Sequence, residues 1–273
     1  MKFRFLLGMV ATVVAGSLGV GITPAHATLS AARRPSVPAE TYVRHARYLS
    51  LFNNPTGPSV IWEKGPAKDA KWERVPALSA GDLQNSFEHA RDEKVLMDLQ
   101  NRNRRASWLY PDDGCFVRAS LTVDRVQQST QISPAKIFAF GSLAVKTPNS
   151  PNGVVEWWYH VAAIAKVVDT PTSGGSVKET MYVYDPAIDP KKPMEVTAWL
   201  QSMQDPSIQI AICSGDSYDP NSDCENGQVG ALDRAKTEAS PYLDNEWYRL
   251  ESLGRDPTRE LGDFPPWLTP FGK

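Results

Sequence analysis

The sequence is poor in the residues that bind metal ions. It contains three Cys and four His among 273 residues, and it has no Cys-x-x-Cys pair. A tetrahedral zinc site needs several such ligands at short, regular spacings. Metal binding is therefore a weak explanation for any chemistry-bearing residue of this chain, and we expect neither a metal nor an organic cofactor.

The chain also lacks an excess of basic charge. Its 29 Lys and Arg are balanced by 31 Asp and Glu, which leaves a formal net charge of −2 with both signs interspersed. A nucleic-acid-binding surface would need a basic patch, so no nucleic-acid partner is expected. After the N-terminus no run is long and apolar enough to span a bilayer, so no membrane partner is expected either.

The first 27 residues have the pattern of a signal peptide. Lys2 and Arg4 supply the charged start, Phe5 to Val20 is largely apolar, and Ala25-His26-Ala27 is a small-x-small cleavage site. We therefore expect an exported protein. It would be secreted to the outside, or periplasmic if it crosses an inner membrane alone.

A leader of residues 28–70 is predicted ahead of the main domain, which we place at 71–273. The leader contains the linker-like stretch 31–38 and the turn-rich stretch 53–58. It is either a removable pro-segment or an N-terminal arm packed on the domain, and Arg33-Arg34 is a candidate processing point.

Hydrophobic periodicity and turn residues predict a mixed set of elements. Helices are expected over residues 79–100 and 195–203, and strands over residues 136–146, 154–165 and 178–184. The last two strands should pair as an antiparallel hairpin that ends at Asp185-Pro186. His89 and the basic cluster 101–105 are expected on the solvated surface, and loops and short helices are expected beyond Ala211.

Cys115 follows a turn that opens into a helix. The turn is Pro111-Asp112-Asp113-Gly114, and helix-compatible apolar residues continue beyond Cys115. Free backbone N–H groups at a helix start stabilise a thiolate and can also receive a developing oxyanion. The alternative is that Cys115 is simply a small buried core residue, which is common for Cys.

The two remaining Cys are well placed to pair. Cys213 and Cys224 lie in a loop-rich segment, 11 positions apart. In an exported protein this pairing would leave Cys115 as the free thiol. The alternatives pair Cys115 with either of the other two and leave a thiol free in a loop.

His160 is the one His in an apolar strand, and Asp185 ends the neighbouring strand. A carboxylate on one imidazole nitrogen leaves the other nitrogen facing a thiol. Cys115, His160 and Asp185 then supply a nucleophile, a base and an orienting acid, in the order seen in transglutaminase and papain-like cysteine enzymes. The alternative is a core His satisfied by backbone or hydroxyl groups.

Four stretches together carry a resemblance to a known family. They are Asp113-Gly114-Cys115-Phe116-Val117-Arg118-Ala119, Trp158-Tyr159-His160-Val161-Ala162, Asp185-Pro186-Ala187 and Thr197-Ala198-Trp199. In type and spacing they resemble the bacterial protein-glutaminases, which are secreted protein-glutamine deamidases, over roughly residues 105–203. The resemblance implies a catalytic triad of Cys115, His160 and Asp185. It also implies a papain/transglutaminase-like α+β fold, with an antiparallel sheet and the Cys at the start of a packed helix.

The expected reaction is hydrolysis of protein-bound Gln to Glu and ammonia through a Cys115 thioester. Its substrates would be proteins or peptides with exposed Gln, and we expect a monomer. A transglutaminase or a cysteine protease with the same triad remains an alternative, as does a non-enzymatic secreted binding module. Trp157, Trp158 and Trp199 would either line a substrate groove or belong to the core.

Overall fold

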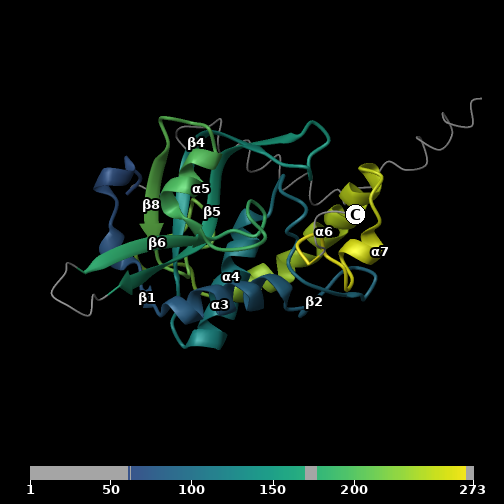
Figure 1. The fold of residues 1–273 in the computed structure, drawn as a ribbon, viewed down its shortest axis with the longest axis horizontal. Helices are drawn as coiled ribbons and strands as arrows, with labels where there is room; N and C mark the ends of the chain where they lie inside the picture. Colours follow the sequence, from purple (N-terminus) through teal and green to yellow (C-terminus); the bar gives the residue numbers. More distant parts are fainter. Residues whose placement is uncertain (1–60, 62, 170–176, 269–273) are drawn as a thin grey trace, which may run out of the picture. The chain divides into compact units, whose positions relative to one another are not determined.

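The computed structural model describes residues 61, 63–169 and 177–268 (Figure 1). All of the described residues lie in one compact unit, Pro35–Lys273.

Several predicted segments lie outside the described residues. These are the signal peptide, most of the leader and residues 170–176 between the two strands of the predicted hairpin. Predictions for these segments therefore stay predictions.

A six-stranded sheet forms the centre of the described unit (Figure 1). Its strands are β1 (Ala77–Leu78), β4 (Ala135–Lys146), β5 (Val154–Asp169), β6 (Lys178–Tyr184), β7 (Met194–Glu195) and β8 (Gln209–Cys213). The order is β7-β6-β5-β4-β8, with antiparallel neighbours, and β1 pairs with β5 in parallel. The three predicted strands and the antiparallel hairpin of β5 with β6 are confirmed.

Strand β5 separates two packed layers because its side chains alternate between the faces of the sheet. Tyr159 and Val161 pack with residues of the Cys115 helix, whereas Ala162 and Ile164 pack in a cluster on the other face. His160 lies on β5 two positions before Ala162, so strand alternation places the two residues on the same face. A register shift in the β4–β5 ladder between Phe140 and Leu143 marks a bulge close to this position.

Helices cover both faces of the sheet. They are α3 (Ala80–Asp92), α4 (Cys115–Thr130), α5 (Val196–Ser202), α6 (Ala231–Ser252) and α7 (Pro257–Glu260), with short 3-10 turns η1 (Ala67–Asp69) and η2 (Trp72–Arg74). Helices α3 and α4 share a buried cluster with Ala163 and Ala165, and α5 buries Trp199 on the opposite face. None of the described helices is long and apolar enough to cross a membrane.

The helix predicted over 79–100 begins as expected but is too long. Ser79 caps it by accepting a hydrogen bond from the Asp82 N–H at 3.0 Å. It ends at Asp92, and a small hairpin of β2 (Leu96–Met97) and β3 (Asn103–Arg104) follows. The turn of this hairpin is held by Asp98, whose carboxylate accepts the N–H groups at positions 100 and 102.

Two further expectations are wrong. Residues 101–105 are not simply a solvated basic face, because Arg104 and Arg105 are only 2% and 5% exposed. The chain beyond Ala211 does not consist of loops and short helices alone. It contains β8 and the 22-residue helix α6, which continues through Pro241 and buries Ala235 and Ala239 against the core.

Candidate active site

Cys115 is the first residue of α4, as the turn before it predicts. Gly114 adopts a left-handed conformation with φ of 79°, which a residue with a side chain rarely adopts. A Cβ at this position would also lie 3.0 Å from the Tyr242 ring. Cys115 is buried and unpaired, because the disulfide joins Cys213 to Cys224 as predicted.

Arg118 holds the segment that leads to Cys115. It lies one helical turn after Cys115 and is 3% exposed. Its Nη1 donates hydrogen bonds to the carbonyl oxygens of Tyr110 at 3.0 Å and Asp113 at 2.7 Å. The turn and the first turn of α4 are thereby tied together by one guanidinium group.

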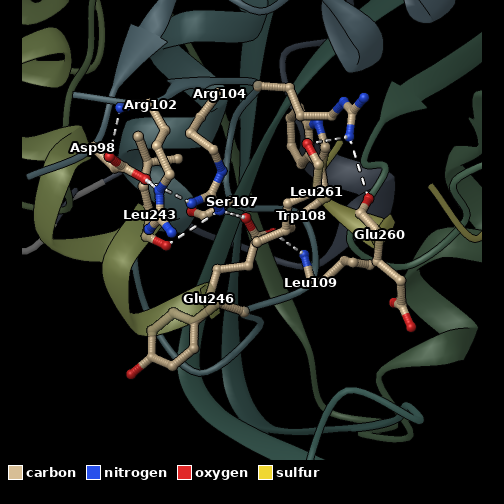
Figure 2. Close-up of polar contacts among 12 residues, drawn as sticks. Asp98, Arg102, Arg104, Ser107, Trp108, Leu109, Leu243, Glu246, Glu260 and Leu261 are labelled. Carbon is tan, nitrogen blue, oxygen red and sulfur yellow. Dashed lines mark hydrogen bonds and ion pairs between the residues drawn. The ribbon is translucent and has the colours of Figure 1, made fainter. Parts of the chain in front are cut away.

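A buried ion cluster ties the same segment to α6 (Figure 2). Arg104 donates to Glu246 at 2.7 Å and to Asp98 at 3.1 Å. Glu246 uses its other carboxylate oxygen to accept the Leu109 N–H at 2.7 Å. Burial raises the pKa of Glu246, although Arg104 and the Leu109 N–H oppose this rise. The cluster therefore holds the backbone just ahead of the Cys115 turn.

His160 and Asp185 form a buried pair beside the end of β6. The β5–β6 ladder begins at the Ala163–Tyr184 pair, so His160 lies just beyond the ladder and Asp185 follows Tyr184 directly. The His160 Nε2–H donates to Asp185 Oδ2 at 2.7 Å, and the two residues are 1% and 4% exposed. The predicted approach of these two side chains is confirmed.

Two tryptophans fix this pair. The Trp199 Nε1–H donates to Asp185 Oδ2 at 2.8 Å, and Trp199 itself is fully buried in the core. The half-buried Trp157 stacks on the His160 ring at 4.3 Å between centroids and an angle of 8°. Trp157 also donates its Nε1–H to the carbonyl oxygen of Pro111 at 2.9 Å. The imidazole is therefore linked to the turn that precedes Cys115.

The electrostatics favour an imidazolium–carboxylate pair. Burial opposes protonation of His160, but the charge and hydrogen bond of Asp185, with a further contribution from Cys115, raise its pKa to about 9. Burial likewise favours the neutral form of Asp185, but His160, the Trp199 N–H and the charge of Arg118 lower its pKa below the ordinary value. At neutral pH the positively charged imidazolium form of His160 is therefore favoured.

The second ring nitrogen of His160 is available for chemistry. Nδ1 is buried and makes no hydrogen bond of normal geometry within the part of the chain that the structure describes. Cys115 is close enough to this ring to raise the pKa of His160 through a side-chain interaction. The structure thus brings together the thiol, the imidazole and the carboxylate that the sequence singled out.

Several residues that shape the site were not predicted to do so. Arg118 and Trp199 lie within the quoted motifs, but the sequence does not indicate which groups they contact. Glu246 and Tyr242 belong to a helix that was not predicted. Of the two alternatives for Trp199, the core position is confirmed. No group of three or more His, Cys, Asp or Glu suited to a metal ion occurs among the described residues.

The fold and the site define a mixed α/β protein with an antiparallel sheet and a buried thiol–imidazole–carboxylate cluster. Residues 83–203, which contain all three groups, match the family model described as glutaminase. The match covers 121 of the 273 residues, so this part of the chain is similar to the glutaminase family.

Solved protein-glutaminase structures show a distant likeness. A crystal structure of protein-glutaminase is 20% identical, with a TM-score of 0.44, over 59% of this chain and 87% of that chain. The NMR structure of protein-glutaminase from Chryseobacterium proteolyticum is 16% identical, with a TM-score of 0.43, over 72% and 95%. A mutant of pro-protein-glutaminase is 20% identical, with a TM-score of 0.41, over 53% and 51%, so the chain spans about half of that pro-form. No curated protein matches the chain in sequence.

Proposed function

We propose that this chain is a secreted protein-glutamine deamidase with Cys115 as nucleophile, His160 as acid and base, and Asp185 as the orienting carboxylate. One observation carries the proposal: a buried His160 bonds Asp185 through Nε2, while its Nδ1, which makes no hydrogen bond of normal geometry among the described residues, is left for Cys115. All three residues lie in the segment that matches the glutaminase family. The domain is then a papain/transglutaminase-like α+β fold, with the nucleophile at the start of a packed helix.

The first half of the reaction forms a thioester. The Cys115 thiolate, paired with the protonated His160, adds to the side-chain carboxamide carbon of a protein-bound Gln. The carbonyl oxygen takes the negative charge, and the backbone N–H of Cys115 is a candidate donor to it. The tetrahedral species collapses when the C–N bond breaks and His160 protonates the leaving nitrogen, which departs as ammonia.

The second half releases the product. His160, now neutral, removes a proton from water as the water adds to the thioester carbon. The C–S bond then breaks, the protein-bound side chain leaves as Glu, and Cys115 returns to its starting form. Asp185 keeps the ring in one orientation throughout and stabilises the imidazolium. The reaction as proposed needs no metal or organic cofactor.

The domain limits are also part of the proposal. We propose removal of residues 1–27 on export and a leader at 28–70, which is either a removable pro-segment or an N-terminal arm of the domain. Within this leader, Ile61 is 2% exposed and its N–H donates to the Pro220 carbonyl at 2.8 Å, while Gly65 forms a β-bridge with Ile210. These contacts favour a cut that leaves residues 61–70 attached to the domain.

The test is ammonia release from a Gln peptide blocked at both ends, with products examined by mass spectrometry. The assay uses the chain from residue 28 and shorter forms that start at residues 61 and 71, with free Gln and a Cys115→Ala variant as controls. Conversion of Gln to Glu with an intact backbone and no added amine would support deamidation. Activity that appears after removal of the leader would make it an inhibitory pro-segment.

Other outcomes would favour the alternatives. Crosslinking in the presence of a Lys peptide would indicate a transglutaminase, because an amine rather than water then resolves the thioester. Backbone cleavage would indicate a cysteine protease. No turnover by any of the three forms would refute the proposal that the protein is an enzyme. A binding function that survives Cys115→Ala would support a secreted binding module.

A further inference from the structure

Among the described residues, the side-chain amide of Asn245 is buried without a hydrogen-bond partner. Asn245 lies on α6 and is 3% exposed, and neither its Nδ2 nor its Oδ1 makes a hydrogen bond with the residues that the structure describes. Buried amides in proteins are nearly always hydrogen-bonded, because leaving one unpaired costs free energy. An aliphatic residue would avoid this cost, so the amide calls for a role beyond packing.

The neighbours of Asn245 on α6 show which way it faces. Tyr242 and Arg249 lie three residues before and four residues after it, so all three share one side of the helix. The Tyr242 ring packs against Gly114, and Arg249 pairs with Asp112 at 2.7 Å. Helical periodicity therefore puts Asn245 on the side of α6 that contacts the turn before Cys115.

The proposed reaction at this turn still needs a second donor to the oxyanion. When a thiolate adds to a carboxamide, the charge that develops on the carbonyl oxygen is best stabilised by two fixed donors in a site without water. The Cys115 N–H, at the start of α4, is one candidate. A neutral Nδ2–H group from the adjacent helix is suited to be the second, and it makes no hydrogen bond with the described residues.

We propose that Asn245 is a further catalytic residue, whose Nδ2–H donates to the substrate carbonyl oxygen as negative charge develops on it. This inference rests on the proposed function of Cys115. Asn245 lies outside residues 83–203, so the family match does not include it. The unpaired amide then lowers the stability of the free protein, because it is kept as a donor for the transition state.

The experiment compares Asn245→Leu with a matched control, Asp244→Asn. Asp244 is the adjacent residue, is also 3% exposed and also has an unpartnered oxygen, but its carboxylate contacts the backbone N–H of Leu99 instead. Three quantities are measured for each protein. These are kcat and KM on a blocked Gln peptide, Tm, and the affinity for a peptide whose Gln carboxamide is replaced by an aldehyde. The aldehyde forms a hemithioacetal with Cys115, and its oxygen occupies the place of the oxyanion.

For Asn245→Leu we expect kcat to fall by about 10²–10³-fold with little change in KM, and the aldehyde to bind more weakly by a similar factor. Its Tm should stay level or rise, because an unpaired buried amide has been removed. Asp244→Asn should keep kcat and aldehyde affinity. A structural role for Asn245 predicts the opposite, with loss of activity only in step with a lower Tm.

Retention of kcat and aldehyde affinity by Asn245→Leu would overturn the inference, as would a loss of both explained by a lower Tm. If the wild type releases no ammonia but captures the aldehyde on Cys115, the proposed reaction fails. In that case the loss or retention of aldehyde affinity in Asn245→Leu still decides the role of Asn245. If the wild type does not capture the aldehyde, Cys115 is not a nucleophile and both proposals fall.

Discussion

Replacing Asp185 with Asn tests the electrostatic basis of the proposed mechanism. The change keeps the size of the side chain and an acceptor for the Trp199 N–H, and it removes the charge that faces His160. Burial opposes protonation of this ring, yet Asp185 and Cys115 raise its pKa from an ordinary 6.5 to about 9. At about 1.4 kcal/mol per pKa unit, this rise is worth about 3 kcal/mol in favour of the imidazolium. Because both residues are buried, solvent screens little of it.

The kinetic consequence follows from the sign of this change. Without the carboxylate, burial should lower the pKa of His160 below 6.5. The imidazolium that pairs with the Cys115 thiolate and protonates the leaving nitrogen then becomes scarce at pH 7.5. A deficit of about 3 kcal/mol corresponds to a fall of about 100-fold in kcat/KM. The basic limb of the pH profile should move from near pH 9 in the wild type to below pH 7 in Asp185→Asn.

The same pair should appear in the pH dependence of stability. Folded His160 keeps its proton until about pH 9, whereas the unfolded residue loses it near pH 6.5. Between these values the folded protein binds one more proton, so the unfolding free energy falls by about 1.4 kcal/mol per pH unit as pH rises. The contribution is complete below pH 6.5 and is lost above about pH 9. Asp185→Asn should lack this slope.

The comparison needs two controls. Burial lowers the pKa of Lys136 to about 7, which gives a stability slope of opposite sign above that pH, so the difference between wild type and variant must be used. Asp189→Asn removes a charge four residues further on, where the carboxylate caps the Lys191 N–H, and it should leave both profiles unchanged. A basic limb that stays near pH 9 in Asp185→Asn, or an unchanged stability slope, would refute the electrostatic argument.

Three further perturbations give separate tests. Trp199→Phe removes the N–H that bonds the Asp185 carboxylate, so urea unfolding should show a loss of at least about 1.5 kcal/mol, with a lower kcat/KM. Lys136→Met should flatten a stability rise of about 1.4 kcal/mol per pH unit between pH 7 and pH 10, because burial lowers the pKa of the folded lysine to about 7. If another group causes this rise in stability, the unfolding free energy of Lys136→Met will rise between pH 7 and pH 10 as much as that of the wild type. A Cys213→Ala/Cys224→Ala double variant should unfold with about 3 kcal/mol less free energy, the chain-entropy value for a loop this short, and should keep its kcat. A large loss of kcat there would show that the disulfide also positions the site.

The elements that carry the site could be predicted because their signals are local. A Pro-Asp-Asp-Gly turn determines where α4 begins, and alternating apolar residues bounded by turns determine β5 and β6. The approach of His160 to Asp185 then follows from antiparallel pairing, since a hairpin brings the end of one strand beside the interior of the other. The disulfide followed from the short loop between two Cys.

The parts that could not be predicted depend on distant partners. Arg104 looks like a surface residue in the sequence, because its partner Glu246 lies 142 positions further along the chain. The early end of α3 also conflicts with its apolar pattern, since Leu96 pairs with β3 instead of continuing the helix. Helix α6 was not predicted because the stretch beyond Ala211 is rich in Pro, Gly, Asp and Ser, which favour loops, whereas tertiary packing stabilises a helix there that includes Pro241.

These distant contacts explain why the matched segment alone does not define the site. Residues 83–203 contain the thiol, the imidazole and the carboxylate, and chemistry of this kind demands that they lie within hydrogen-bond reach. Three contacts from α6 hold the backbone on the approach to Cys115: Glu246 on the Leu109 N–H, Tyr242 against Gly114, and Arg249 on Asp112. The identity of the reacting groups is therefore local in the sequence, but the position of the thiol depends on a helix that begins 28 residues after the matched segment ends. A test of function on this chain consequently needs α6 in place, because a shorter fragment would remove the supports of the Cys115 turn together with Asn245.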